Sequence, residues 1–165
     1  MKLGRGLVVI GWLAALGVIA SAVMGYAAPS GSDVEELQMH VLLALAAVLL
    51  LLFAHCWILL YLIFTGRAVR EVVKEYGLDP ALPAASSRLQ ADAVPWLLLA
   101  MGLGLGTFLL GSGAAANALP AWIHHVLGYA ALAAQVYALW VERRVLADHE
   151  RLVAEVDRLI AAPAG

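Results

Sequence analysis

The sequence predicts an all-α integral membrane protein, a bundle of four transmembrane helices. Of the 165 residues, 64% are apolar and 13% are charged, which is more apolar surface than a soluble domain of this size can enclose. The apolar residues gather in four blocks, each near the ~20 residues that cross the hydrocarbon layer, at 7–28, 41–64, 94–111 and 120–141. Because lipid offers the backbone no hydrogen-bond partner, each block is expected to be helical.

The positions of the cations predict how these helices are oriented. All ten Lys and Arg residues lie outside the segments 27–39 and 112–120. Because Lys and Arg accumulate on the cytoplasmic side, these two segments are predicted to face out and both termini to face the cytoplasm. A bacterial inner membrane is the expected location. The net charge of −2 is not concentrated in a basic patch, so nucleic-acid binding is not expected.

The transmembrane part is predicted to consist of two tandem hairpins of two spans each. Shifting the sequence by 84 positions aligns Trp12 with Trp96 and His40 with His124, and each Trp precedes its His by 28 residues. Such internal similarity is typical of a duplicated unit. An even number of spans in each unit makes the repeats parallel, so that paired positions lie at the same depth.

The two ends of the first hairpin each need a separate interpretation. Its first span, 7–28, follows two cations and also fits a secretory signal peptide cleaved near 20–22, but its counterpart in the second hairpin favours a retained helix. The second span is expected to continue as a charged helix over 67–76, which Gly77 ends. The segment 81–93 is then expected to be a loop.

The chain after the fourth span, 143–165, is predicted to be a cytoplasmic helix and tail, apart from the transmembrane domain 1–142. Its apolar face is expected to hold residues at alternating spacings of three and four, at Leu146, His149, Val153, Val156 and Ile160. That spacing predicts a short amphipathic helix that continues the fourth span. Through 143–160 it would contact a partner helix, a second copy of the chain or the surface of the lipid membrane.

His40 and His124 are the main candidate ligands. Imidazoles at one depth on two parallel helices can bind one haem iron from opposite faces, or approach one ion. Small residues such as Gly128 follow them at helical spacing and leave room for a flat macrocycle. His125 lies about 100° around the helix from His124, so it is expected to be an interfacial or secondary group. The alternative is that the small residues only pack the bundle and the histidines face lipid headgroups.

His55 follows His40 by 15 residues on the same predicted helix, roughly 22 Å along its axis. With histidines at 40, 55 and 124, the chain resembles the four-helix b-type cytochrome membrane subunits over all four spans. The resemblance implies an electron-transfer subunit that binds one haem b near the outer face through His40 and His124. It would exchange electrons with quinone or with a membrane or periplasmic redox subunit. The sequence departs from a two-haem pattern because the repeat partner of His55 is Leu139, so His55 is expected to hydrogen-bond within the bundle, for instance to Gln135, or to line a quinone site.

Two other functions are compatible with the sequence. Glu36 lies four residues before His40, and together with His124 these side chains could bind Zn or Cu. Acidic residues at this position also complement the dipole of a helix start. A cofactor-free accessory or scaffold subunit would instead dock a partner through its charged inner helices. No nucleophile, phosphate loop or hydrolytic triad is evident in the sequence, so a stand-alone enzyme is not expected.

Overall fold

The computed structural model is a bundle of long α-helices. It describes residues 2–27, 34–115 and 118–161. In this part of the chain the helices are α1 (Lys2–Ala27), α2 (Val34–Glu75), α3 (Ala81–Ala115) and α4 (Ala121–Ala161). The prediction of an all-α chain with four helices is therefore confirmed. Three of the helices are much longer than the spans predicted within them, with 42 residues in α2, 35 in α3 and 41 in α4.

Three of these helices are long and apolar enough to cross a membrane. The spans lie at Gly6–Tyr26, Val34–Glu75 and Ala81–Gly111, in α1, α2 and α3. They indicate a membrane-associated protein. The helix α4 does not reach the same hydropathy, because His124, His125 and Gln135 interrupt its apolar half. A fourth span in α4 stays a prediction.

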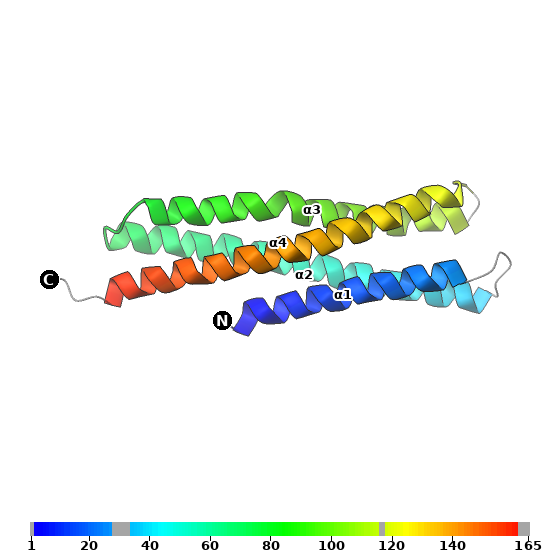
Figure 1. Ribbon diagram of the computed structural model, residues 1–165, viewed down its shortest axis with the longest axis horizontal. Coiled ribbons are helices and arrows are strands. Elements are labelled where there is room, and N and C mark those ends of the chain that lie inside the picture. Colours follow the sequence, from blue (N-terminus) through cyan, green and yellow to red (C-terminus); the bar gives the residue numbers. More distant parts are fainter. Residues whose placement is uncertain (1, 28–33, 116–117, 162–165) are drawn as a thin grey trace.

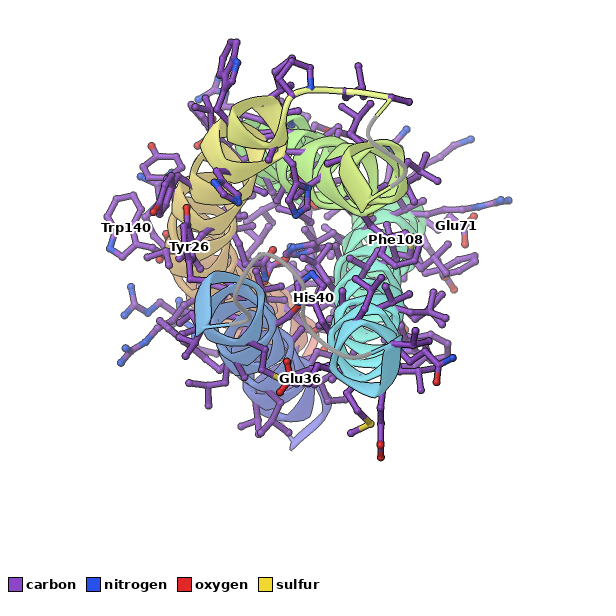
Figure 2. The ribbon with its side chains drawn as sticks, turned by 90° about the vertical axis from the view of Figure 1, so that its right-hand side faces the viewer. Tyr26, Glu36, His40, Glu71, Phe108 and Trp140 are labelled. Atoms are coloured by element: carbon purple, nitrogen blue, oxygen red, sulfur yellow. The ribbon has the colours of Figure 1, made fainter. Side chains whose placement is uncertain are left out.

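The helices form a ring. The pairs α1–α2 and α3–α4 pack against each other, and contacts of α2 with α3 and of α4 with α1 close the ring, so that α2 and α4 are diagonal (Figures 1 and 2). The end at which α1 finishes and α2 begins, and at which α3 finishes and α4 begins, is called the loop end. The opposite end, which holds the C-terminal end of α4, is called the tail end. At the tail end α2, α3 and α4 continue beyond the start of α1 (Figure 1). The bundle therefore changes from four helices to three along its length.

The prediction that 81–93 is a loop is wrong, because α3 begins at Ala81. The Asp79 carboxylate accepts a hydrogen bond from the Ala81 N–H at 2.8 Å, and the Asp79 carbonyl accepts one from the Leu82 N–H at 3.1 Å. Asp79 is thus the N-cap, and Pro80 occupies the first helical position, where its missing N–H costs nothing. The segment is too polar for a membrane span, but its many alanines favour a helix.

The predicted end of α2 is confirmed. The helix ends at Glu75, and Gly77 has a φ of 63°, a left-handed conformation that a residue without a side chain adopts easily. The N–H of Leu78 returns to the carbonyl of Val73 at 3.0 Å, as in a glycine-terminated helix. The turn between α2 and α3 therefore needs only a few residues, and the two helices pack side by side from the tail end upward.

The buried core lies in the middle and at the tail end. One cluster draws on all four helices, with Leu7, Ile58, Leu62, Ala93, Leu97, Val141, Val145 and Leu146. A second cluster joins the tail-end extensions of α2 and α4 through Val69, Val73 and Val156. Val153 and Ile160 pack against this second cluster, so the predicted amphipathic face of the C-terminal helix is confirmed. That helix is a direct continuation of α4, and its apolar face meets α2 of the same chain.

The loop end is less densely packed. Toward it, buried apolar side chains stop at Ala47 on α2 and at Ala131 on α4. Beyond these positions the inward-facing residues of both helices, including His40, His124 and Gly128, are only half-buried. The four-helix part of the bundle is thus filled with buried apolar side chains in the half toward the tail end. It is less tightly packed in the half toward the loop end.

Candidate functional site

His40 is held against α1 at the loop end. Its Nδ1 lies 2.9 Å from the backbone carbonyl oxygen of Ser21 and 3.3 Å from the Ser21 hydroxyl. Because a carbonyl oxygen only accepts, the Nδ1 atom carries the proton in this contact. Gly25 lies against the ring, and a Cβ there would come within 2.9 Å of the His40 Cε1. The side chain points into the bundle, while Trp140 and Glu71 point outward (Figure 2).

His124 is held against α3 in the same manner. Its Nδ1 lies 3.1 Å from the backbone carbonyl oxygen of Thr107, and a Cβ on Gly111 would come within 2.8 Å of its Cε1. In both helix pairs the imidazole therefore meets a hydroxyl residue and, four positions later, a glycine. The matching residues on α1 and α3 are 86 positions apart, whereas the two histidines are 84 apart. The structural correspondence thus differs by two residues from the ungapped alignment of the sequence.

The two imidazoles share a chemical arrangement suited to a ligand between them. They come from the diagonal helices α2 and α4. Among the described residues the Nε2 of His40 and of His124 has no hydrogen-bond partner. An Nδ1–H bonded to a backbone carbonyl fixes the tautomer in which Nε2 offers its lone pair, as in histidines that bind metals.

His125 faces a different part of the bundle from His124. Its ring lies 4.7 Å from the ring of Tyr26 on α1, and Tyr26 in turn stacks on Tyr129 at 6.1 Å between centroids. This contact is between the edges of α1 and α4, whereas His124 contacts α3. His124 therefore packs against α3, whereas His125 packs against α1.

Gly106 and Gly128 lie in the same half of the bundle as the two histidines. A Cβ on Gly128 would meet only the Thr107 methyl group, at 3.8 Å, and a Cβ on Gly106 would meet nothing within 4 Å. Glu36 is exposed in the first turn of α2 beside Glu35, where both carboxylates complement the helix dipole. Among the described residues no three His, Cys, Asp or Glu side chains form a group that could hold a metal ion, so Glu36 does not join the histidines in such a group.

His55 belongs to a separate buried cluster in the middle of the bundle. Its Nδ1 contacts Oε1 of Glu142, and its Nε2 lies 2.9 Å from Oε1 of Gln135. The relative exposure is 0% for His55 and Glu142 and 1% for Gln135. Gln135 and Glu142 are seven residues apart and therefore share one face of α4. The expected bond between His55 and Gln135 is confirmed, and both ring nitrogens are used within the protein.

Sequence reasoning missed Glu142. It stands directly before Arg143 and Arg144, at the predicted end of the transmembrane domain, where a charged side chain is expected to face water. The signal that could have found it is the two-turn spacing from Gln135, which places an acidic side chain on the inward face of α4 opposite His55. Gly11 of α1 is also required here, because a Cβ at that position would lie 2.5 Å from the Leu139 side chain and 4.0 Å from Glu142 Oε2.

A third polar group lies nearer the tail end. The Nε2 of His149 lies 2.6 Å from the Thr65 hydroxyl, and the ring of Tyr61 meets the imidazole edge-on at 6.0 Å. The Nδ1 of His149 is buried without a partner. Burial lowers the pKa of His149 below its ordinary value, which favours the neutral imidazole. His149 thus acts as a polar contact between α4 and α2 within an apolar interface.

In the part of the chain that the structure describes, histidines thus lie at three levels of the bundle, and His40 and His124 each bond to a backbone carbonyl through Nδ1. The middle cluster uses both nitrogens of its imidazole, and the tail-end group is enclosed by apolar residues. In comparisons with known proteins, no family model, no curated protein and no solved structure matches this chain.

Proposed function

We propose that the protein is a membrane electron-transfer subunit that binds one b haem between His40 and His124. The matched anchoring of the two imidazoles carries this proposal. Each Nδ1 is bonded to a backbone carbonyl of the neighbouring helix, at 2.9 Å for His40 and 3.1 Å for His124, which leaves both Nε2 atoms for an axial ligand bond. Diagonal helices are suited to this role because their side chains approach the bundle axis from opposite sides.

The residues around the pair are compatible with a flat macrocycle. Gly25 and Gly111 let the imidazoles lie against their neighbouring helices, and Gly106 and Gly128 add no side chains to the loop-end half of the bundle. A haem bound here supplies a one-electron couple of its iron, and the protein orients its axial ligands. The segments 27–39 and 112–120 hold no Lys or Arg. The propionates would therefore be solvated by neutral polar groups and water.

The proposal includes an orientation. With the loop end outside, all ten cations lie at or beyond the tail-end side of the spans, in the cytoplasm of a bacterium. The haem would then sit near the outer face of the inner membrane. Its electron partners would be a quinone in the bilayer or a membrane or periplasmic redox subunit. The helices α2, α3 and α4 would extend into the cytoplasm beyond the last turn of the membrane domain.

Absorption spectra of the purified protein test the proposal. Protein from cells supplied with haem should show a Soret band that changes on reduction. The variants His40→Ala and His124→Ala should lose the band, whereas His125→Ala, the matched control one position away, should keep it. Circular dichroism of each variant checks that the helices are retained. A wild-type sample that lacks the band overturns the proposal, and metal analysis of that sample tests Zn or Cu at the same histidines.

The three-helix extension favours a cofactor-free scaffold subunit as a second candidate. Its core is formed by α2 and α4, and its outward faces carry exposed charges such as Arg70 and Lys74. A partner bound there should copurify in fixed stoichiometry with the full chain. Reversing the charge with Arg70→Glu and Lys74→Glu should release the partner without altering the helical circular dichroism spectrum. Failure of any protein to copurify stoichiometrically removes the basis for this candidate.

A further inference from the structure

The cluster of His55, Glu142 and Gln135 lies where an uncompensated charge is most costly. All three side chains are fully buried between α2 and α4, and α2 is one of the helices able to cross a membrane. An ionised carboxylate in such a position needs a partner of opposite charge, because the surroundings cannot solvate it. Ionisable groups inside a membrane protein are usually functional. The net charge of this cluster therefore depends on how many protons His55 and Glu142 hold.

The hydrogen bonds show how many protons the cluster can hold. With Gln135 Oε1 as the acceptor, the Nε2 of His55 carries a proton. On the other side of the ring, either Nδ1–H donates to the Glu142 carboxylate or a protonated Glu142 donates to Nδ1. These two arrangements contain the same number of protons and have no net charge. They differ only in the place of one proton along the contact between Nδ1 and Oε1.

We propose that His55 and Glu142 form an intramembrane proton-binding site that stores one exchangeable proton, with Gln135 as the group that adapts to its loss. Release of the proton leaves a neutral ring whose Nδ1–H still donates to the carboxylate, and the site then carries one negative charge. The pair titrates as a unit, because each group changes the charge that the other feels.

Gln135 is arranged to accommodate both states. After release, the bare Nε2 of His55 would face Gln135 Oε1, and two acceptors repel each other. A half-turn of the amide brings the Gln135 Nε2 hydrogens to the ring nitrogen instead. In the present arrangement this Gln135 Nε2 is buried without a partner, so the half-turn breaks no hydrogen bond. Amide oxygen and nitrogen are nearly isosteric, and the same space fits both orientations.

Among the residues whose side chains the structure describes, no other ionisable group contacts the site. The neighbour from α1 is Gly11, which faces an Oε2 of Glu142 that has no hydrogen-bond partner. On α3 the nearest charge, Asp92, is exposed and paired with Arg144 of α4 at 3.5 Å. Toward the tail end, the next titratable groups are Tyr61 of α2 and His149 of α4. The apolar cluster that includes Leu7, Ile58 and Leu62 lies between them and the site. A proton is therefore the species that restores neutrality here.

Nitrogen NMR of the full chain in lipid nanodiscs, labelled with ¹⁵N-histidine, tests the proposal. His55 is assigned by comparison with His55→Gln. As the pH is raised, the wild-type signals of His55 should pass in one step from the proton-bearing to the proton-released form. Infrared spectra over the same range should show a coincident change in the carboxyl absorption of Glu142, identified with Glu142→Gln. A His55 spectrum that stays constant from mildly acidic to alkaline pH overturns the proposal and leaves a purely structural pair.

Variants add a second, independent comparison. In Glu142→Gln the ring loses its anionic partner, so its proton should be released at least tenfold more readily, at a pH lower by one unit or more. Gln135→Leu removes the neutral partner of Nε2 in both forms, so it should move the step by less than Glu142→Gln does. The control His149→Gln, in the other buried histidine group, should leave the step unchanged. Unaltered titration of His55 in Glu142→Gln overturns the proposal. None of these readouts requires a haem.

Discussion

The loop end and the middle of the bundle use histidine in opposite surroundings. At the loop end, His40 and His124 are half-buried, each is bonded to one backbone carbonyl, and a glycine of the neighbouring helix makes room for each ring. In the middle, His55 is fully buried and bonded through both nitrogens to side chains of α4. The role open to each imidazole thus depends on how many of its nitrogens the protein already uses and on whether the adjacent space is filled.

Removal of the buried carboxylate should produce the largest effect and would sharpen this contrast most. In Glu142→Ala the His55 ring loses its partner in an apolar environment, which should lower the free energy of unfolding by roughly 3–5 kcal/mol. By comparison, His40→Ala removes one half-buried hydrogen bond and should cost about 1 kcal/mol. Unfolding in mixed micelles, followed by circular dichroism, measures both. Replacing both His55 and Glu142 by Leu should recover most of the loss, and equal costs for the two single variants would contradict the contrast.

Glycine substitutions separate packing from ligand binding at an intermediate size of effect. Gly11→Ala places a Cβ 2.5 Å from the Leu139 side chain in the filled half, and should destabilise the bundle by roughly 1–3 kcal/mol. Gly25→Ala displaces the His40 ring instead and should weaken the Soret band more than it lowers stability. Gly102→Ala is the matched control, because a Cβ there meets nothing within 4 Å. A Soret band unchanged in Gly25→Ala would show that the position of the ring is not critical.

A pH effect is expected at the tail end. Because burial lowers the pKa of His149, the folded protein keeps this ring neutral while the unfolded chain takes up a proton below its ordinary pKa of about 6.5. The stability that the neutral ring confers is present above that pH and is lost as the pH falls from there toward the folded pKa. The protection factors of the α4 amides around His149, obtained from hydrogen exchange after correction for the intrinsic rates, should therefore fall in mild acid. His149→Gln should remove this pH dependence, and an unchanged dependence would exclude His149 as its source.

The smallest effect is expected from the exposed pair of Glu155 and Arg158. A hydrogen bond from Arg158 lowers the pKa of Glu155, but both side chains lie in water, where an ion pair adds little to stability. Arg158→Gln should therefore return the Glu155 titration to its ordinary range without a measurable change in unfolding. NMR titration and the micelle assay check the two halves of this prediction. A clear loss of stability would show that the tail helix depends on surface charge as well as on its apolar face.

Local patterns accounted for much of the fold. Apolar blocks located the helices, Gly77 located the end of α2, and the heptad spacing of the tail located its buried face. The segment 81–93 was misassigned because membrane hydropathy and helix propensity are different properties, and this Ala-rich segment has only the second. Glu142 was missed because its partner His55 is 87 residues away, and such a pairing depends on how α2 and α4 face each other. The anchors of His40 and His124 are backbone atoms, whose positions no residue type reveals.

The two-residue difference between the helix pairs shows that the anchoring of the imidazole does not require one fixed length of chain between the helices. From Gly25 to His40 there are 15 positions, but from Gly111 to His124 only 13. Surface connections usually tolerate changes in length. What the two pairs share is the step of four residues from Ser21 to Gly25 and from Thr107 to Gly111, about one turn of a helix. We therefore expect an insertion within that turn to displace the imidazole, and a change in length between the helices to be tolerated far better.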